Sequence, residues 1–329
     1  MRNRPSQPAA MRIAIAGAGG FARILAQQII NQTAHPVLVL SRSMRADFEE
    51  QCPGCQLAVV NYEDVENLRY TLQGVDLVIS TIAGVEQLNL IDAARRARVR
   101  RFVPSEFEGD LSHRPTEDPL DRGGQSALGV LEQQPQSRSY TLAYTVFSCG
   151  IFMERFASGG LQVYDIGAGS GIQGPTDYLV NIADRQAEIV ASNAHGRPAQ
   201  VSLTSVYDVA RFVTSAIELG LAHWPREFRM RGETTTVEAI VRTCSDVRGV
   251  TFNLVARHYQ EVEMQVEQAQ RTGDWDRYYY LQRLLQTANG RYHVRSPNLH
   301  DFVNQTEATT VHPMRFRAWL EYYWGPAAI

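Results

Sequence analysis

The sequence contains no lysine: all 32 basic residues in this chain of 329 residues are arginine. An arginine guanidinium stays protonated in proteins, so it cannot act as a tunable amine base or form a Schiff base. Every mechanism that needs a lysine of this chain is therefore excluded.

Cysteine is also scarce, with four residues, and this number does not indicate a disulfide framework in a chain of this length. Cys52 and Cys55 form a C-x-x-C pair, but Pro53 and Gly54 between them are typical of a turn. A redox motif of this kind opens a helix directly after a strand, whereas this pair is expected between a helix and a strand. We interpret it as a turn and expect no metal site.

No apolar run is long enough to cross a bilayer, and the net charge of -3 gives no reason to expect a nucleic-acid partner. Residues 1–10 carry arginine and proline but lack the apolar segment of a signal peptide, so we expect a disordered tail there. The composition is that of a globular protein, which we expect to be cytoplasmic and without a membrane partner.

Short apolar strands alternate with helical segments over residues 11–156. Strands are expected at 12–16, 37–40, 57–60, 75–80, 99–103 and 140–147. Single helices between consecutive strands imply right-handed crossovers and a parallel sheet. The pattern predicts an α/β fold with a doubly wound parallel (Rossmann) sheet in residues 11–156.

The alternation loosens afterwards, and residues 157–329 are expected to form a smaller α+β region that covers a substrate and partly returns to the sheet. Helix starts are predicted at four places. Thr204 or Ser205 is placed to cap one helix, Thr235-x-x-Glu238 is a capping box, Asp274 precedes a helix at 275–287, and Pro313 begins a last helix ending near Trp324.

A glycine turn follows the first strand and satisfies G-x-G-x-x-A. Gly17 permits a tight turn, Gly19 lets the backbone approach a pyrophosphate, and Ala22 lets the helix pack close to the strand. The helix that begins near Gly20 and Phe21 offers N–H groups and the positive end of its dipole to phosphates. Placed between a first strand and a first helix, the turn predicts a dinucleotide site.

The end of the second strand distinguishes the two nicotinamide cofactors. An NAD site has an acidic residue there, whereas this chain has Ser41 and Arg42. The arginine fork suits a 2′-phosphate, so we predict NADP(H). Thr81, Ile82 and Ala83 follow the fourth strand and are expected beside the ribose and pyrophosphate.

The chain resembles the NmrA-like and isoflavone-reductase-like branch of the atypical short-chain dehydrogenases. The matching segments are IAIAGAGGFAR, VLSRS, RRARVRRFVPSEFEGD, DPLDRGG, FSCGIFMERF and LTSVYDVARFV. The resemblance implies NADPH bound across the sheet edge, with the run Pro104 to Phe107 on the nicotinamide side and Ser148, Cys149 and Gly150 close to the ring. It also implies reduction of a hydrophobic aromatic or specialised metabolite.

The sequence departs from the family at the catalytic position. The lysine that the resemblance implies aligns with Gly124, and the tyrosine of older short-chain dehydrogenases aligns with Leu120. Neither residue can donate a proton. Arg23 replaces the third glycine of the related G-x-x-G-x-x-G pattern, where it is expected to contact the pyrophosphate.

Four other residues are candidates for the proton transfer. Histidine is a common general acid or base, which makes His113 the first candidate, and Ser105 can bond a carbonyl oxygen. Glu106 lies in the loop after the fifth strand, and Tyr178 lies in the expected substrate region. These residues leave three hypotheses open. The first is an NADP(H)-dependent oxidoreductase with a hydrophobic small-molecule substrate. The second is a cofactor-retaining isomerase or cyclase without net redox change, and the third is a non-enzymatic NADP(H) sensor. A homodimer is compatible with all three.

Overall fold

The computed structural model describes residues 10–133, 140–168, 174 and 178–325, so most of the expected N-terminal tail lies outside the described residues. Six parallel strands form the main sheet in the order β3-β2-β1-β4-β5-β6. They are β1 (Ile13–Ala16), β2 (Val37–Ser41), β3 (Gln56–Val59), β4 (Leu77–Ser80), β5 (Arg101–Val103) and β6 (Ala143–Tyr144). This order confirms the predicted Rossmann sheet, whose direction of winding reverses between β1 and β4.

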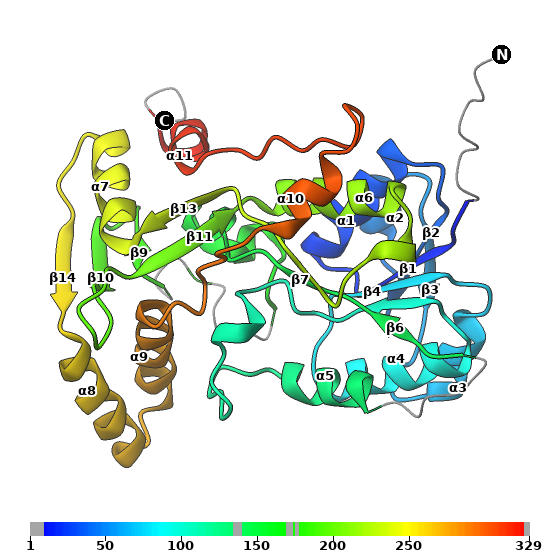
Figure 1. Ribbon diagram of the computed structural model, residues 1–329, viewed down its shortest axis with the longest axis horizontal. Coiled ribbons are helices and arrows are strands. Elements are labelled where there is room, and N and C mark those ends of the chain that lie inside the picture. The colour runs from blue at the N-terminus through cyan, green and yellow to red at the C-terminus, as the bar shows by residue number, and fades with distance from the viewer. Residues whose placement is uncertain (1–9, 134–139, 169–173, 175–177, 326–329) are drawn as a thin grey trace.

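Helices cover both faces of the sheet because alternate strand residues point to opposite sides. Ile13 and Ile15 pack against α1 (Gly20–Gln32) and α6 (Val206–Glu218). Ala14 and Ala16 face the other layer, which consists of α3 (Val65–Thr71), α4 (Val85–Arg96) and α5 (Gly124–Glu132). Figure 1 shows the two helical layers on opposite sides of the sheet. A short helix, α2 (Ala46–Gln51), follows β2.

The chain after β6, which we call the second region, builds three small sheets. β7 (Val146–Ser148) pairs with β12 (Glu227–Arg229), and β11 (Gln200–Thr204) lies between β8 (Ile151–Phe152) and β13 (Glu233–Thr236). β10 (Gln186–Val190) lies between β9 (Val180–Asn181) and β14 (Asn253–Arg257). The accompanying helices are α7 (Val237–Arg248), α8 (Tyr259–Thr272), α9 (Trp275–Ala288), α10 (Asn298–Val303) and α11 (Phe316–Trp324).

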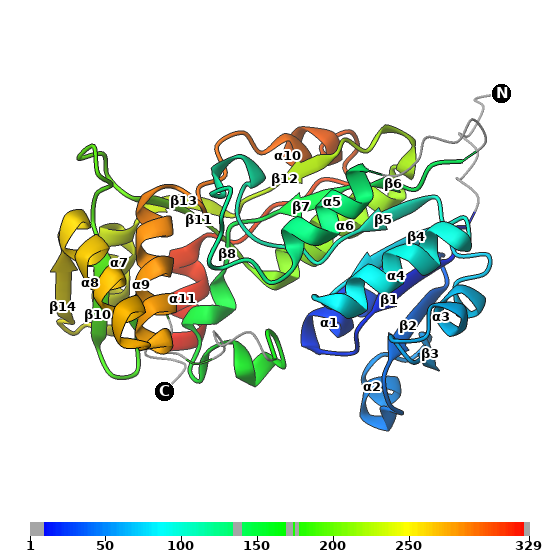
Figure 2. The ribbon, with the colours of Figure 1, turned by 90° about the horizontal axis from the view of Figure 1, so that it is seen from below.

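This second region has a core of its own, with side chains from β10, β11, α7, α9 and α11. Figures 1 and 2 show α7, α8 and α9 with β10 and β14 at one end of an elongated molecule and the main sheet at the other. The region also returns to the main sheet, since α6 packs with α1 on one face of it. Among the described helices, none is long and apolar enough to span a membrane.

Two predicted element boundaries are wrong. The strand expected at 140–147 divides at Thr145, because β6 pairs with β5 while Val146 already donates its N–H to Arg226 beside β12. The last helix begins at Phe316 rather than Pro313. Met314 donates its N–H to the carboxylate of Asp208 at 2.8 Å, which holds the intervening segment outside the helix.

The predicted helix caps are mostly confirmed. Ser205 accepts the N–H of Tyr207, and Asp274 accepts the N–H of Arg277 at 3.2 Å. The cap of α7 is Thr236, whose hydroxyl accepts the N–H of Ala239, so the predicted capping box at Thr235 is wrong by one position. Thr235 itself lies in β13, opposite Val201. The C-x-x-C pair is the expected turn between α2 and β3, with both thiols free.

The Asp274 cap provides a test of this architecture. We expect Asp274→Ala to lower the free energy of unfolding by about 1 kcal/mol, since the substitution leaves an N–H group of α9 without its acceptor. Glu263→Ala, on the exposed surface of the neighbouring helix α8, is the control and should change stability by less than about 0.5 kcal/mol. Urea titrations measure both values, and equal losses for the two variants would contradict the assignment of the cap.

Candidate functional site

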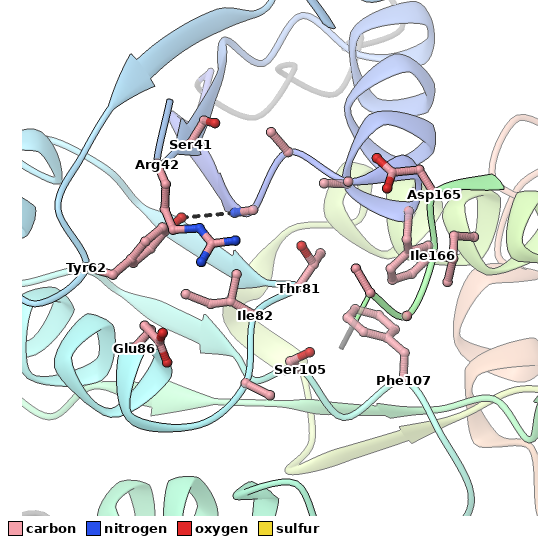
Figure 3. A pocket seen from close by; sticks show the side chains of 18 of the residues that line it. Ser41, Arg42, Tyr62, Thr81, Ile82, Glu86, Ser105, Phe107, Asp165 and Ile166 are labelled. Atoms are coloured by element: carbon pink, nitrogen blue, oxygen red, sulfur yellow. Dashed lines mark hydrogen bonds between the residues drawn. The ribbon is translucent and has the colours of Figure 1, made fainter. Parts of the chain in front are cut away.

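A pocket of about 450 Å³ opens at the carboxyl ends of the main-sheet strands, and we call it the main pocket. It lies where the winding of the sheet reverses, which is the usual place for ligands in open α/β sheets. Figure 3 shows its walls converging from the ends of β1, β2, β4 and β5 and from a segment of the second region. Nine residues predicted as site residues line it: Gly17, Gly19, Phe21, Ser41, Arg42, Thr81, Ile82, Ala83 and Ser105.

The glycine turn is held by hydrogen bonds between distant parts of the chain. Gly17 has a φ of 102° and donates its N–H to the carbonyl of Leu40 at 2.9 Å and to the hydroxyl of Tyr62 at 3.0 Å. Tyr62 in turn donates to the same carbonyl. A Cβ on Gly17 would collide with the Thr81 hydroxyl. Only glycine therefore fits this turn, in both its backbone angle and its space.

The first turn of α1 faces the main pocket with unsatisfied donors. Gly19 is the N-cap and supplies no side chain, and the first turn contains no acidic residue. Within the described part of the chain, the N–H groups of Phe21 and Ala22 have no acceptor, while Gly20 donates to the carbonyl of Asp165 at 2.8 Å. Free N–H groups and an uncompensated helix dipole form a binding site for an anion.

Two arginines follow β2 and differ in their partners. Arg45 bonds the carboxylate of Asp47 at 3.0 Å and lies 3.8 Å from that of Asp165; the bond to Asp47 raises the pKa of Arg45 and lowers that of Asp47. Arg42 has neither a hydrogen bond nor an ion pair with any described residue, and Figure 3 shows it extending into the main pocket. Arg42 is thus a cation at the end of β2 that is available to a second anionic group.

Aromatic side chains form the opposite wall. Phe107 makes an edge contact with Phe21 at 4.8 Å between ring centroids, and Phe152 lies 5.4 Å from Phe21. Ile166 completes the apolar surface. Ser105 adjoins it, and its N–H donates to the buried amide oxygen of Gln87 at 2.7 Å. This end of the main pocket suits a flat, weakly polar ring with one hydrogen-bonding group.

The structure places the other predicted site residues outside the lining of the main pocket. Arg23 donates a hydrogen bond to the side chain of Gln51, and the N–H of Gly20 donates to the carbonyl of Asp165. Pro104, Cys149 and Gly150 are in the interior; burial raises the pKa of the Cys149 thiol, and a Cβ on Gly150 would collide with the Ser202 carbonyl.

Two of the four proton-transfer candidates lie apart from the main pocket. His113 is in a short turn beside Ser112 and Asp110. Tyr178 is buried in the core of the second region, where its hydroxyl bonds that of Thr287, and burial raises its pKa. Neither side chain lines the main pocket, so neither meets a ligand bound there in this conformation.

Glu106 lies behind Ser105 in a buried cluster of charged residues. Its carboxylate accepts a hydrogen bond from Arg114, and burial raises its pKa against the opposing charge of that arginine. Arg291 extends the cluster, because its guanidinium lies 3.0 Å from Glu108 and 2.5 Å from Asp118. Charges this deeply buried require partners, and these ion pairs connect the loop after β5 to the residues after α9.

Gly124 makes room for this cluster. A Cβ at position 124 would lie on the carboxylate oxygen Oε1 of Glu106, so the carboxylate occupies the space into which a longer side chain would extend. A separate small pocket shares Ala83, Ser105 and Arg122 with the main pocket and is also lined by residues of the cluster. Among the described residues, no group of three His, Cys, Asp or Glu side chains is placed to hold a metal ion.

Sequence reasoning missed several residues of the main pocket. Tyr62 follows the third strand without a motif, and Asp165 to Ala168 reach the pocket from the second region. No local pattern marks either set, because both meet the glycine turn only through long-range folding. Phe107, which the family resemblance places on the nicotinamide side, lines the main pocket, whereas Phe152 lies in a segment of that resemblance without having been predicted.

Comparisons with known proteins agree with this geometry. The model of the NmrA-like family matches residues 10–271. An oxidoreductase named swnR from Metarhizium robertsii is 26% identical over 230 residues, which are 68% of this chain and 69% of that protein. A phenylcoumaran benzylic ether reductase from Ginkgo biloba is 27% identical over 197 residues, 54% of this chain and 60% of the relative's length.

A solved structure shares the fold at lower identity. The binary complex of leucoanthocyanidin reductase with NADPH from Vitis vinifera superposes with a TM-score of 0.66 and 14% identity. The match covers 95% of this chain and 99% of that one. The likeness therefore extends over the second region as well as the main sheet.

Substitutions at two glycines of α5 test whether the Glu106 carboxylate fills the space beside Gly124. Gly129 has open space around its Cβ position, so Gly129→Ala should stabilise the protein by about 0.5–1 kcal/mol. Gly124→Ala should instead destabilise it by about 1–3 kcal/mol, because the new methyl group displaces the Glu106 carboxylate. Denaturant titrations measure the difference, and two equally stable variants would show that the carboxylate does not fill this space.

Proposed function

This chain belongs to the NmrA-like family, and from that premise we propose that it is an NADP(H)-dependent oxidoreductase acting on a hydrophobic small molecule. The observation that carries the proposal is the pairing of two anion sites at one pocket. The free N–H groups of Phe21 and Ala22 form one, and Arg42 forms the other at the end of β2.

The residues present fit this cofactor. Phe21 and Ala22 would hold the pyrophosphate, and the glycines at 17 and 19 keep the backbone free of side chains there. Arg42 would hold the 2′-phosphate with its planar fork, and no acidic residue at the strand end competes with it. The nicotinamide, which supplies the hydride when bound, would rest against the apolar wall of Phe107, Phe152 and Ile166.

The substrate side is proposed from the same wall. Aromatic side chains offer a flat apolar surface, and Ser105 offers a hydroxyl beside it. The Ginkgo relative is named for reduction of a benzylic ether, which is an aromatic substrate. We therefore propose an aromatic metabolite that has an oxygen substituent within reach of Ser105.

Proton transfer would depend on Ser105 and on water. Leu120 and Gly124 carry no titratable group, and His113 and Tyr178 do not line the main pocket. Glu106 is engaged by Arg114, which stabilises its ionised form against burial. Ser105 would orient the reacting oxygen with its hydroxyl and pass a proton from water.

The lack of a strong general acid favours a second candidate function. A site without a strong general acid suits an isomerisation or cyclisation in which the cofactor is retained and no net redox change occurs. Gly124 and the ion pair of Glu106 with Arg114 are the observations that favour it.

A deuterium-transfer assay distinguishes these functions. The protein is incubated with NADPH that carries deuterium at the transferred position and with a panel of aromatic ethers and conjugated carbonyl compounds. We expect loss of nicotinamide absorbance in a 1:1 ratio with a deuterated product, detected by mass spectrometry. An unlabelled rearranged product without cofactor loss would establish the second function. Binding of NADPH and NADP⁺ with different affinities but no product from any compound would identify a sensor.

Arg42 provides a test of the cofactor assignment. Arg42→Ala should weaken NADPH binding by about tenfold or more and leave NADH binding nearly unchanged, because only NADPH has the charged 2′-phosphate. Arg45→Ala is the matched control with a smaller loss, since Arg45 is already bonded to Asp47. Fluorescence titrations measure the affinities, and an equal loss for both cofactors would refute the role of Arg42.

A further inference from the structure

The segment Gly159–Ala168 crosses the mouth of the glycine turn, and we call it the strap. We propose that Asp165 of the strap acts as an internal anion beside the phosphate site, where it bonds the Gly20 N–H and lies next to Arg45, and that it must be displaced when NADP(H) binds. This inference rests on the proposed function. It adds an autoinhibitory contact to the main pocket.

The backbone of the strap makes the first contact, with a donor next to the free N–H groups of Phe21 and Ala22. Gly20, at the start of α1, donates its N–H to the carbonyl of Asp165 at 2.8 Å. The approach is so close that a Cβ on Gly20 would collide with the carbonyl of Tyr164. A donor of the helix N-terminus, which otherwise serves an anionic ligand, is thus taken by the protein's own carbonyl.

The carboxylate of Asp165 makes the second contact. Its Oδ2 lies 3.8 Å from the guanidinium of Arg45, and it is within 4 Å of the Cβ position of Gly19. Figure 3 shows Asp165 beside the start of α1, on the wall of the main pocket. A negative charge therefore stands between the helix N-terminus and an arginine that follows β2, which is where phosphates are expected.

The strap has apolar anchors on both sides of Asp165. Leu161 and Ile166 pack in the hydrophobic core beside the main sheet, so the strap is not loose as a whole. Between these anchors, Asp165 has a φ of 53°, a left-handed conformation that few residues with a side chain adopt, although Asp and Asn adopt it more readily than most. Gly159, Gly160 and Gly167 also have positive φ values. Rotation about Tyr164 and Asp165 would free the Gly20 N–H without removing the apolar anchors.

The exposure of the charged groups determines how strongly Asp165 should weaken NADPH binding. The side chains of Asp165 and Arg45 are 54% and 36% exposed, so water screens both their attraction and the repulsion of Asp165 from a phosphate. Removing the charge should therefore strengthen NADPH binding about two- to fivefold. Asn is the appropriate replacement, because it tolerates the left-handed conformation and keeps the backbone carbonyl in place.

A matched pair of variants tests the proposal. Asp47 bonds the same arginine as Asp165 but does not line the main pocket. Titration with NADPH should show a two- to fivefold gain for Asp165→Asn and no gain for Asp47→Asn. Equal gains would mean that freeing Arg45 is sufficient, and an unchanged or weaker affinity of Asp165→Asn would overturn the proposal. Failure of all three proteins to bind NADPH would instead refute the proposed function.

Hydrogen exchange provides a second readout in the wild-type protein. Asp165 and Ile166 donate their N–H groups to Gln162 and Leu161 within the strap, at 3.0 Å and 3.2 Å. If saturating NADPH displaces Asp165, these two amides should exchange faster while those of Phe21 and Ala22 exchange more slowly. Slower exchange throughout the strap would show that it closes over the cofactor, contrary to the proposal.

Discussion

The unpaired N–H groups at the start of α1 are the constraint on which the rest of the main pocket depends. A helix leaves its first donors without acceptors, and most helices satisfy them with a capping side chain or an acidic residue in the first turn. Helix α1 has neither, because Gly19 is its N-cap and no acid follows. The chain keeps this uncompensated end at the carboxyl edge of the sheet, where the ends of β2 and β4 bring Arg42 and Thr81 to the same opening.

Much of this arrangement is local in the sequence and could be predicted. The alternation of apolar strands with helices specifies a parallel sheet, and the glycine turn and Arg42 lie within a few residues of strand ends. The residues that escaped prediction act across long separations. Tyr62 bonds Gly17 across 45 residues, and Asp165 reaches Gly20 from a different region of the fold. Neither carries a periodic or turn signal, so only the folded chain reveals that they share the pocket.

The division of the predicted strand at Thr145 shows a similar limit. An apolar run indicates extended backbone, but it does not specify the neighbouring strand. Here the first part pairs within the main sheet, and the second part pairs with β12, a strand that comes about 80 residues later in the chain. The outcome depends on hydrogen bonds from Thr145 to Pro225 and from Val146 to Arg226. Such a change of partner also carries the backbone from the cofactor half of the molecule into the second region.

The structure around Gly124 shows what takes the place of the lysine that the family resemblance implies at this position. A glycine there does not leave an empty space, because the Glu106 carboxylate extends into it and, through Arg114, joins Glu108 and Arg291 in a buried network. Buried ions tolerate the loss of a partner poorly, so each member constrains the others. An amine at position 124 would therefore have to displace a carboxylate that already has a partner. Since Arg291 comes from the second region, the ion network and the strap both make the pocket depend on that region. The glycine turn supplies the anion site, but residues far along the chain form the opposite wall of the pocket.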